Sequence, residues 1–348
     1  MNPVKFIFST LFSNKNVIDG AKKQPWWLAI VLMLLSCIIS VIPSFSGAMS
    51  TNGSDALTAT QNYGVDLALK QFSLDYLGKD DYSFVIEDGK LKVENFEKAE
   101  VKINDKISLI VQYVDFTEAD KIQYETIEKK MSVELSKLRV SYPVNGEENT
   151  SYLYSTLLLG KESLYLSLYG KDAKCTYSPN ANSDGSYTIN SYLNTENNYT
   201  QLEGTYERIT GQLANISGYA YGNTDGEKVN NAFENWKQFF DLAYLTPRNN
   251  SAFITNGAMI GVSLLIVLSS TLMIFLLSKM KSSLRKFKFL ESFKMVCYAS
   301  FSPALIALLV GWLIPSFQSM AFVMCLVLRI TWLGMKATGP QDTGTVRK

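Results

Sequence analysis

The chain has 348 residues, 47% of them hydrophobic, with 33 Lys and Arg against 32 Asp and Glu. Its formal net charge of +1 gives no indication of a nucleic-acid partner. The sequence contains no histidine, which excludes a Ser-His-Asp triad, a Cys-His dyad and any zinc site that uses histidine.

Charge and apolar residues are unevenly distributed along the chain. Residues 46–252 hold 19 basic and 29 acidic side chains, a net charge of −10, and the rest holds 14 basic and 3 acidic ones, a net charge of +11. The apolar residues cluster in the parts that flank this acidic segment. Of the four cysteines only Cys175 lies within residues 46–252, so no intrachain disulfide can form inside that segment.

Four apolar runs have the length of about 17 to 25 residues that a bilayer-crossing helix needs. Lys and Arg gather at one end of each apolar run. Short cytoplasmic loops are enriched in these residues, so we expect those ends to face the cytoplasm. The sequence therefore predicts an α-helical membrane protein with four transmembrane helices, both termini cytoplasmic, and an inserted extracytoplasmic α+β domain. The expected parts are a cytoplasmic segment at 1–25, helices at 26–45, 257–278, 293–315 and 317–335, the inserted domain at 46–252, a basic cytoplasmic loop at 279–292 and a tail at 336–348.

The first apolar run, within "WWLAIVLMLLSCIISVIPSFSGAMS", has three interpretations. Cys37 could be a lipoprotein processing site, although "IISVI" continues the apolar run beyond it. Ser46 and Ala48 are small residues that a signal peptidase accepts. We favour an uncleaved membrane anchor, because the 25 residues before the run have a helical pattern of their own. In that segment Val4, Phe8, Leu11 and Phe12 share one helical face, which predicts an interfacial helix.

The inserted domain alternates helical and strand patterns. A helical spacing covers parts of residues 54–77, and "YSFVIEDGKLKVEN" predicts a hairpin with Asp88-Gly89 at its turn. Further strands are expected in residues 99–116 and on both sides of Gly160-Lys161. The motif "TEAD" predicts a capping box before a helix that reaches about Lys130. Two late helices are expected, with apolar positions at Leu202, Tyr206, Ile209, Leu213 and Ile216, and at Val229, Phe233, Trp236 and Phe240.

The search for chemistry yields no catalytic, metal-binding or cofactor-binding residues. The motifs GxxxxGK[ST], GxGxxG, CxxC and HExxH are all missing from the sequence, and no cofactor is expected. A group of tyrosines could stack on sugar rings, or could line a core or a protein interface; its members are Tyr192, Tyr199, Tyr206, Tyr219 and Tyr221.

Two sets of charged residues are candidates for function. Arg329 interrupts the last apolar run, and a charge within a span usually has a partner or a role. We expect it to pair with Glu291 or to extend toward the inner membrane edge, and a functional role stays open. The basic loop could bind anionic lipid headgroups or could serve only to set the topology; its charges are Lys279, Lys281, Arg285, Lys286 and Lys288.

The layout resembles the YvdJ-like family of membrane proteins from low-GC Gram-positive bacteria, often described as maltodextrin-utilisation proteins. The matching stretches are "KFIFSTLFSNKNV", the "IP" at Ile42-Pro43, "YSFVIEDGKLKVEN", "LIVQYVDFT" and "FKMVCYASFSPALIALL". The resemblance runs along the whole chain and is weakest in residues 130–250. It implies a bacterial plasma-membrane protein with a link to sugar uptake, and it transfers no catalytic residue.

Three functions remain as hypotheses. The first is a non-enzymatic accessory or sensing protein whose outer domain binds a partner, such as a transporter permease, or a saccharide. The second is a membrane-organising helical bundle that binds anionic lipid through its basic inner loops. The third, an enzyme, depends only on carboxylates with no assigned role.

Overall fold

The structure is a computed structural model. It describes residues 3–58, 65–103, 106–126, 129–131, 133–134, 139–144, 147–152, 155–169, 176–181, 187–190, 199–280 and 287–338. The chain forms two compact units, a helical unit of residues 1–50 and 249–348 and an α+β unit of residues 51–248. The sequence pattern placed the limits of the inserted domain at 46 and 252.

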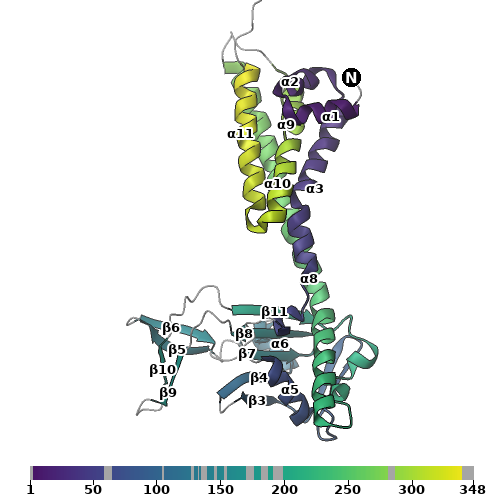
Figure 1. The fold of residues 1–348 in the computed structure, drawn as a ribbon, viewed down its shortest axis with the longest axis vertical. Helices are drawn as coiled ribbons and strands as arrows, with labels where there is room; N and C mark the ends of the chain where they lie inside the picture. The colour runs from purple at the N-terminus through teal and green to yellow at the C-terminus, as the bar shows by residue number, and fades with distance from the viewer. Residues whose placement is uncertain are drawn as a thin grey trace, which may run out of the picture. The chain divides into compact units, whose positions relative to one another are not determined.

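Among the residues that the structure describes, four helices are long and apolar enough to cross a membrane, as in a multi-pass membrane protein. Helices α3, α10 and α11 run side by side in the helical unit (Figure 1). Its helices are α1 Pro3–Phe12, α2 Asn14–Lys23, α3 Trp26–Ser50, the part of α8 (Asp225–Met280) from Asn249 onward, α9 Phe289–Ala299, α10 Phe301–Leu313 and α11 Gln318–Thr338, with the 3-10 turn η3 Pro315–Phe317 between the last two.

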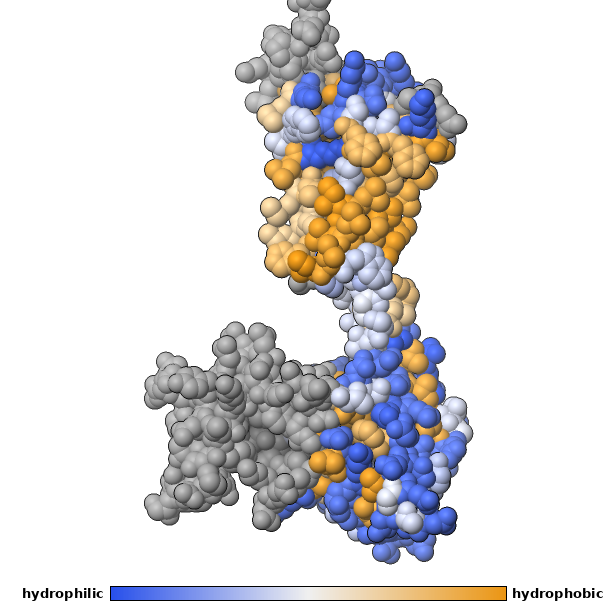
Figure 2. Space-filling view, in the orientation of Figure 1, coloured by the Kyte–Doolittle hydropathy of each residue, from blue (hydrophilic) through white to orange (hydrophobic). Residues whose placement is uncertain are grey.

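Small residues lie at contacts between helices of the helical unit, beside larger buried side chains such as Leu32 and Leu326. Ala29, Ala304 and Ala307 are fully buried where α3, α9 and α10 meet, whereas Leu313 of α10 is 82% exposed and Leu328 of α11 is 67% exposed. The visible face of this unit is correspondingly apolar over most of its length, with hydrophilic residues near the end where α2 lies (Figure 2). Helices that meet within a membrane favour small residues at their contacts, because lipid solvates large apolar side chains as well as protein does.

The third candidate span is broken near its middle. It begins at Phe289, four residues before the predicted start, and α9 ends at Ala299. Helix α10 begins at Phe301, and Pro303 lies in its first turn. The sequence predicted one helix over 293–315. The interruption at Ser300 agrees with the loss of a backbone donor at Pro303.

A five-stranded sheet forms the centre of the α+β unit (Figure 1). Its strand order is β11-β8-β7-β4-β3, and β4 and β7 are parallel while the other neighbouring pairs are antiparallel. The strands are β3 Lys98–Ile103, β4 Lys106–Val114, β7 Ser155–Gly160, β8 Ser163–Tyr169 and β11 Tyr199–Thr205.

Shorter elements complete this unit. The hairpin of β1 (Ser83–Glu87) and β2 (Lys90–Glu94) turns at Asp88-Gly89, with φ values of 51° and 72°, as predicted. Two further hairpins pair β5 with β6 and β9 with β10. The remaining bounds are α4 Asp55–Thr58, α5 Val65–Tyr76, α6 Glu118–Tyr124, β5 Arg139–Val144, β6 Glu147–Tyr152, β9 Thr176–Ala181, β10 Tyr187–Asn190, and the 3-10 turns η1 Gly211–Ala214 and η2 Ile216–Tyr219.

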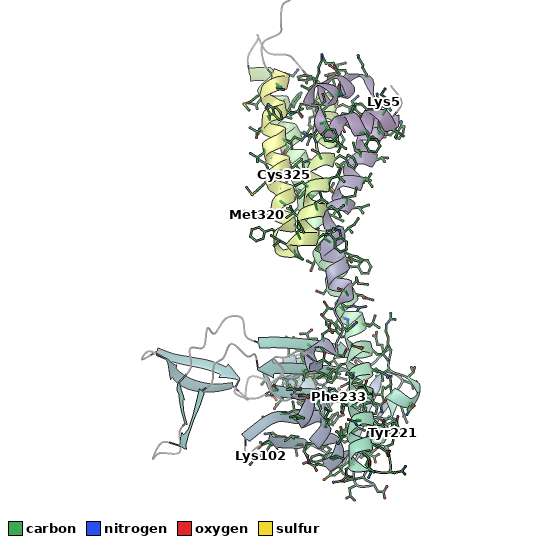
Figure 3. All side chains as sticks on the ribbon, viewed as in Figure 1. Lys5, Lys102, Tyr221, Phe233, Met320 and Cys325 are labelled. Carbon is green, nitrogen blue, oxygen red and sulfur yellow. The ribbon has the colours of Figure 1, made fainter. Side chains whose placement is uncertain are left out.

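The core of the α+β unit lies between one face of the sheet and helices α5 and α8. Phe72 of α5 and Trp236 of α8 are fully buried in it, as are Leu157 and Leu166 of the sheet. The indole Nε1 of Trp236 donates a hydrogen bond of 3.0 Å to the hydroxyl of Ser73. At the edge of this core Phe233, labelled in Figure 3, is partly buried, and its ring centroid lies 4.5 Å from the ammonium nitrogen of Lys70.

Two predicted helices differ in the structure. Residues 202–216 form the end of β11 and two 3-10 turns, although Leu202, Tyr206, Ile209 and Ile216 are buried as the apolar spacing implied. Pairing of β11 with β8 prevails over the helical spacing, which Gly204 and Gly211 already weaken. Helix α6 has the predicted capping box but ends at Tyr124, because Glu125 has a φ of 64°.

Candidate intramembrane polar site

Arg329 of α11 donates hydrogen bonds to three other helices of the helical unit, α1, α9 and α10. Its Nη1 donates to the carbonyl oxygen of Ala299 at 3.1 Å and to the hydroxyl of Ser302. Its Nη2 donates to the carbonyl oxygen of Thr10 in α1. The planar guanidinium can bond to acceptors from α1 and from the α9–α10 break at once because its donors point in fixed, separate directions.

The two carbonyl groups that Arg329 contacts lack helical donors for identifiable reasons. In a continuous helix the Ala299 carbonyl would accept from residue 303, but Pro303 has no N–H. Thr10 lies in the last turn of α1, where carbonyl groups have no partner within the helix. A cation is also favoured at a helix C-terminus, because the helix dipole places partial negative charge there. Arg329 therefore satisfies backbone groups that would otherwise be unpaired in an apolar environment.

Glu291 does not join this site. Its Oε2 accepts the backbone N–H of Lys288 at 2.9 Å and so caps the start of α9. In the part of the chain that the structure describes, no ion pair links it to Arg329. The predicted pairing of the two residues is replaced by separate contacts with the backbone.

A second polar contact fixes the entry of the first span, and the sequence analysis missed it. The ammonium group of Lys294 donates to the Gln24 carbonyl at 2.7 Å, and the Tyr298 hydroxyl donates to the Pro25 carbonyl at 3.2 Å. Both acceptors lie in the short link between α2 and α3. In the sequence, Pro25 is the residue that indicates free carbonyl groups here, because a helix usually ends before a proline and leaves carbonyl groups without a helical partner.

The basic loop is described only at its edges. Lys279 is exposed with its ammonium 5.5 Å from the Phe275 ring, and Lys288 is exposed at the start of α9. Lys281, Arg285 and Lys286 lie outside the described residues. The described edges place exposed positive charge at the end of α8 and the start of α9.

Helix α1 has a buried face and an exposed face. Phe6 and Thr10 are buried in the helical unit, and the Phe6 ring meets the Tyr298 ring edge-on at 4.9 Å. On the other face Val4, Phe8 and Phe12 are exposed. This is the face predicted to contact the membrane interface, and no described part of the helical unit covers it.

Among the tyrosines that could stack on sugar rings or line a core or interface, the three with described side chains do not all lie at the surface. Tyr206 and Tyr219 are core residues, with hydroxyls that donate to the carbonyls of Ser163 at 3.1 Å and Leu213 at 2.6 Å. Burial raises the pKa of both phenols above the usual range. Tyr221 is exposed, Tyr192 lies outside the described residues, and the side chain of Tyr199 is not described.

The α+β unit carries a surface hollow of about 320 Å³, which we call the lysine hollow; it is lined by Lys90, Phe116, Glu118, Lys121, Lys161 and Glu162. Lys90 pairs with Glu162 at 3.0 Å, and Lys121 pairs with Glu118. Among the described residues no carboxylate pairs with Lys161. An aromatic ring surrounded by donors and acceptors is a common arrangement in sites for polar small molecules.

Comparison with known proteins identifies no relative. No family model matches the chain, and neither a curated protein nor a solved structure matches it significantly. The likeness to YvdJ-like proteins is therefore still an expectation from the sequence. Within the described residues, no three His, Cys, Asp or Glu side chains gather as they would around a metal ion.

Proposed function

We propose that this protein is a multi-pass protein of the bacterial plasma membrane with both termini in the cytoplasm and residues 46–252 outside. The supporting observations are the four candidate spans and the distribution of charge, since the acidic segment lies between the first two spans and the basic residues flank the others. The first span remains attached in this proposal. Ala29 and Leu32 of α3 are buried against the other helices, a packing role that a cleaved leader would not have.

Its role is that of a non-enzymatic accessory or sensing component, with an outer domain that binds a protein partner or a saccharide. One observation carries this proposal: the segment between the first two spans forms a unit with its own buried core and an open lysine hollow. A link to sugar uptake, with a transporter permease as partner, rests on the resemblance to YvdJ-like proteins alone.

The carboxyl groups with shifted pKa values favour the non-enzymatic proposal. The backbone N–H of Thr117 and the ammonium of Lys130 lower the pKa of Asp120 to about 2, and Lys129 lowers the pKa of Glu125. A general acid at neutral pH needs a raised pKa instead. These two carboxylates end and cap a helix, which is a structural role.

Binding of maltodextrins to the full-length protein in nanodiscs tests the proposal that the outer domain binds a saccharide. Saturable binding that Phe116→Ala abolishes and Tyr221→Ala leaves intact would support a site in the lysine hollow. Both substitutions remove an aromatic ring from the α+β unit, and Tyr221 lies outside the hollow. Crosslinking in native membranes tests the partner branch. Recovery of a stoichiometric permease supports the proposal, and failure of both assays contradicts it.

The second candidate is a membrane-organising bundle that binds anionic lipid. The exposed face of α1 and the exposed Lys279 and Lys288 favour it, because an amphipathic helix beside basic residues binds anionic membrane surfaces. Neutralising Lys279, Lys281, Arg285, Lys286 and Lys288 would then abolish a preference for phosphatidylglycerol over phosphatidylcholine. Neutralising five lysines of the α+β unit is the matched control and should leave that preference unchanged.

A further inference from the structure

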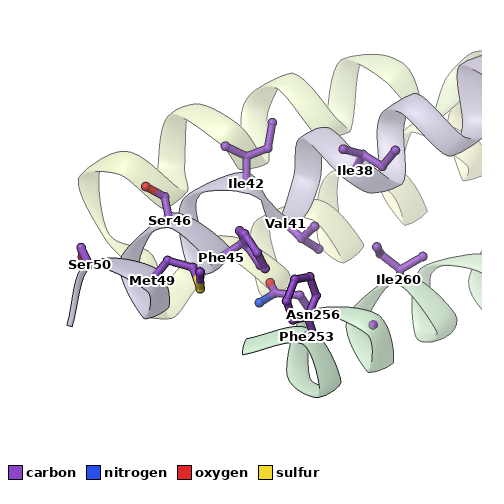
Figure 4. Close-up of a pocket in the computed structure, with 11 residues that line it drawn as sticks. Ile38, Val41, Ile42, Phe45, Ser46, Met49, Ser50, Phe253, Asn256 and Ile260 are labelled. Carbon is purple, nitrogen blue, oxygen red and sulfur yellow. The ribbon is translucent and has the colours of Figure 1, made fainter. Parts of the chain in front are cut away.

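An apolar groove of about 750 Å³ lies between α3 and α8 within the helical unit (Figure 4). Its walls are Val41 and Phe45 on α3 and Phe253, Gly257 and Ile260 on α8, and the rings of Phe45 and Phe253 lie 5.3 Å apart. No lining residue carries a charge. The groove is open, and both of its walls belong to helices apolar enough to cross a membrane.

The polar atoms at the floor of the groove are already satisfied. Asn256 is 5% exposed; its Oδ1 accepts from the Ser44 hydroxyl at 2.6 Å, and its Nδ2 donates to the Ala252 carbonyl at 2.8 Å. A ligand in the groove therefore meets no unpaired amide that it must hydrogen-bond. The floor suits a hydrocarbon chain.

One end of the groove is apolar and the other end carries hydroxyl groups. A membrane leaflet likewise changes from an apolar middle to a polar surface. Ile38 lies toward the middle of the first span, and Ser46 and Ser50 lie where α3 ends. These positions are twelve residues apart, or about 18 Å at helical rise. The groove is therefore apolar where the leaflet is apolar and offers hydroxyl groups where ester groups of lipids are found.

The groove has the volume of a site for a small ligand. Ligand sites in proteins fall between about 300 and 1,000 Å³, which includes this groove. An acyl chain is the occupant that the surrounding bilayer supplies.

We propose that this groove binds one acyl chain of a membrane phospholipid, with the chain end near Ile38 and Ile260 and the ester region near Ser46 and Ser50. Recognition is through the apolar chain and is independent of the headgroup, unlike lipid binding by the basic loop. The site does not depend on the proposed accessory role.

Two glycines of α8 provide a matched pair for testing this site. A Cβ built at either Gly257 or Gly261 has nothing within 4 Å, so the fold leaves room for a side chain at both positions. Gly257 lines the groove and Gly261 does not. Gly257→Leu therefore fills the groove, and Gly261→Leu adds the same side chain to the same helix outside it.

The experiment uses the full-length protein in nanodiscs made with a phospholipid that carries a diazirine midway along one acyl chain. After irradiation, mass spectrometry of peptides should locate crosslinks mainly in residues 38–45 and 253–260. Gly257→Leu should reduce these crosslinks at least about tenfold, the factor expected for losing the burial of about two methylene groups. Gly261→Leu should not reduce them.

Changing the headgroup from phosphatidylglycerol to phosphatidylcholine should leave the crosslinks in place. The proposal is overturned by even labelling of all exposed span faces, by equal labelling of both glycine variants, or by dependence on the headgroup. In a cysteine-free background, an oxidative disulfide between two copies of an Ile260→Cys variant would show a second chain in the groove and would also overturn it. Thermal unfolding of each variant establishes that the bundle is intact.

Discussion

The α+β unit and the helical unit differ in where they place their apolar side chains. The α+β unit encloses large aromatic residues, with Trp236 edge-on to Tyr219 and Phe239 and tilted against Phe240. The helical unit buries small residues such as Ala29 beside large ones, and it exposes leucine, as at Leu309 and Leu313. In water, burial of apolar area stabilises the aromatic core of the α+β unit. Helices in lipid are stabilised mainly by close packing and internal hydrogen bonds.

The polar side chains of the helical unit also form hydrogen bonds suited to an environment without water. In the spans, serine and threonine hydroxyls bond to carbonyl groups of their own helix, as Ser36 does to Leu32 and Thr271 to Val267. Arg329 supplies the donors that the broken helix lacks. Such internal pairing is required where no water is present, because an unpaired backbone group in hydrocarbon costs several kcal/mol. The comparison therefore predicts which substitutions each unit tolerates.

The largest effect is expected at Trp236. Replacement by alanine removes a fully buried ring and the hydrogen bond to Ser73, and should lower the free energy of unfolding of the α+β unit by about 3–5 kcal/mol. Denaturant unfolding monitored by limited proteolysis within residues 51–248 measures it. Tyr221→Ala, at an exposed position, should stay within about 0.5 kcal/mol. Equal effects at both positions would contradict an aromatic core.

Arg329 should have the next largest effect. In Arg329→Leu the carbonyls of Thr10 and Ala299 lose their donor, at about 1–3 kcal/mol for each unpaired group. Hydrogen exchange in nanodiscs should then show α1 losing protection by roughly 10- to 100-fold. Lys336→Leu, which removes an exposed cation from the same helix, should leave α1 protected.

Arg329→Lys tests whether the positive charge of Arg329 or the planar shape of its guanidinium is required. An ammonium keeps the charge but lacks the planar fork that reaches two helices, so α1 should still lose protection. Full rescue by lysine would show that the positive charge alone is required and would contradict the account of Arg329 as a donor to two helix ends.

Close packing in the helical unit predicts a smaller effect at Gly311. A Cβ there would lie 2.9 Å from atoms of Pro43 and Gln318, so α10 and α3 would have to separate. Gly311→Val should destabilise the bundle by about 1–3 kcal/mol, measured by thermal unfolding in detergent. Gly261→Val has open space around it and should be neutral. Similar melting temperatures for the two variants would count against contact between α3 and α10.

The smallest effect concerns pH and the capping box of α6. The pKa of Asp120 is lowered to about 2, so its contribution to stability is complete above the unfolded value near 4 and is lost as pH falls toward 2. Thr117→Ala removes the hydroxyl donor to Asp120 but keeps the backbone N–H, so it should raise this pKa only in part, and Lys130→Met should raise it further. Carboxyl NMR of labelled aspartate follows the change, with Glu118→Gln as a control in the same turn. An unaltered Asp120 titration in both Thr117→Ala and Lys130→Met would contradict these contacts.

Local signals in the sequence predicted local structure well. The Asp88-Gly89 turn, the Thr117 cap and the apolar spans each depend on residues close together in the chain. The helix predicted over residues 202–216 failed because pairing with β8 is a long-range interaction that spacing cannot show.

The partners of Arg329 could not be predicted for a similar reason. They are backbone carbonyls, which every residue carries, and only Pro303 marks the one at Ala299 as free. The acyl-chain groove had no sequence signal at all, because its walls come from helices more than two hundred residues apart.

The most direct test of the central claim is labelling of single cysteines in intact cells with a membrane-impermeant maleimide, in a background in which Cys37, Cys175, Cys297 and Cys325 are replaced by serine. The account predicts that Tyr221→Cys reacts in intact cells, whereas Lys288→Cys reacts only after the membrane is permeabilised. Both positions are exposed, so access to the reagent decides the result. Labelling of Lys288→Cys alone in intact cells would reverse the proposed orientation, and labelling of both would contradict the proposal that Tyr221 and Lys288 lie on opposite sides of the membrane.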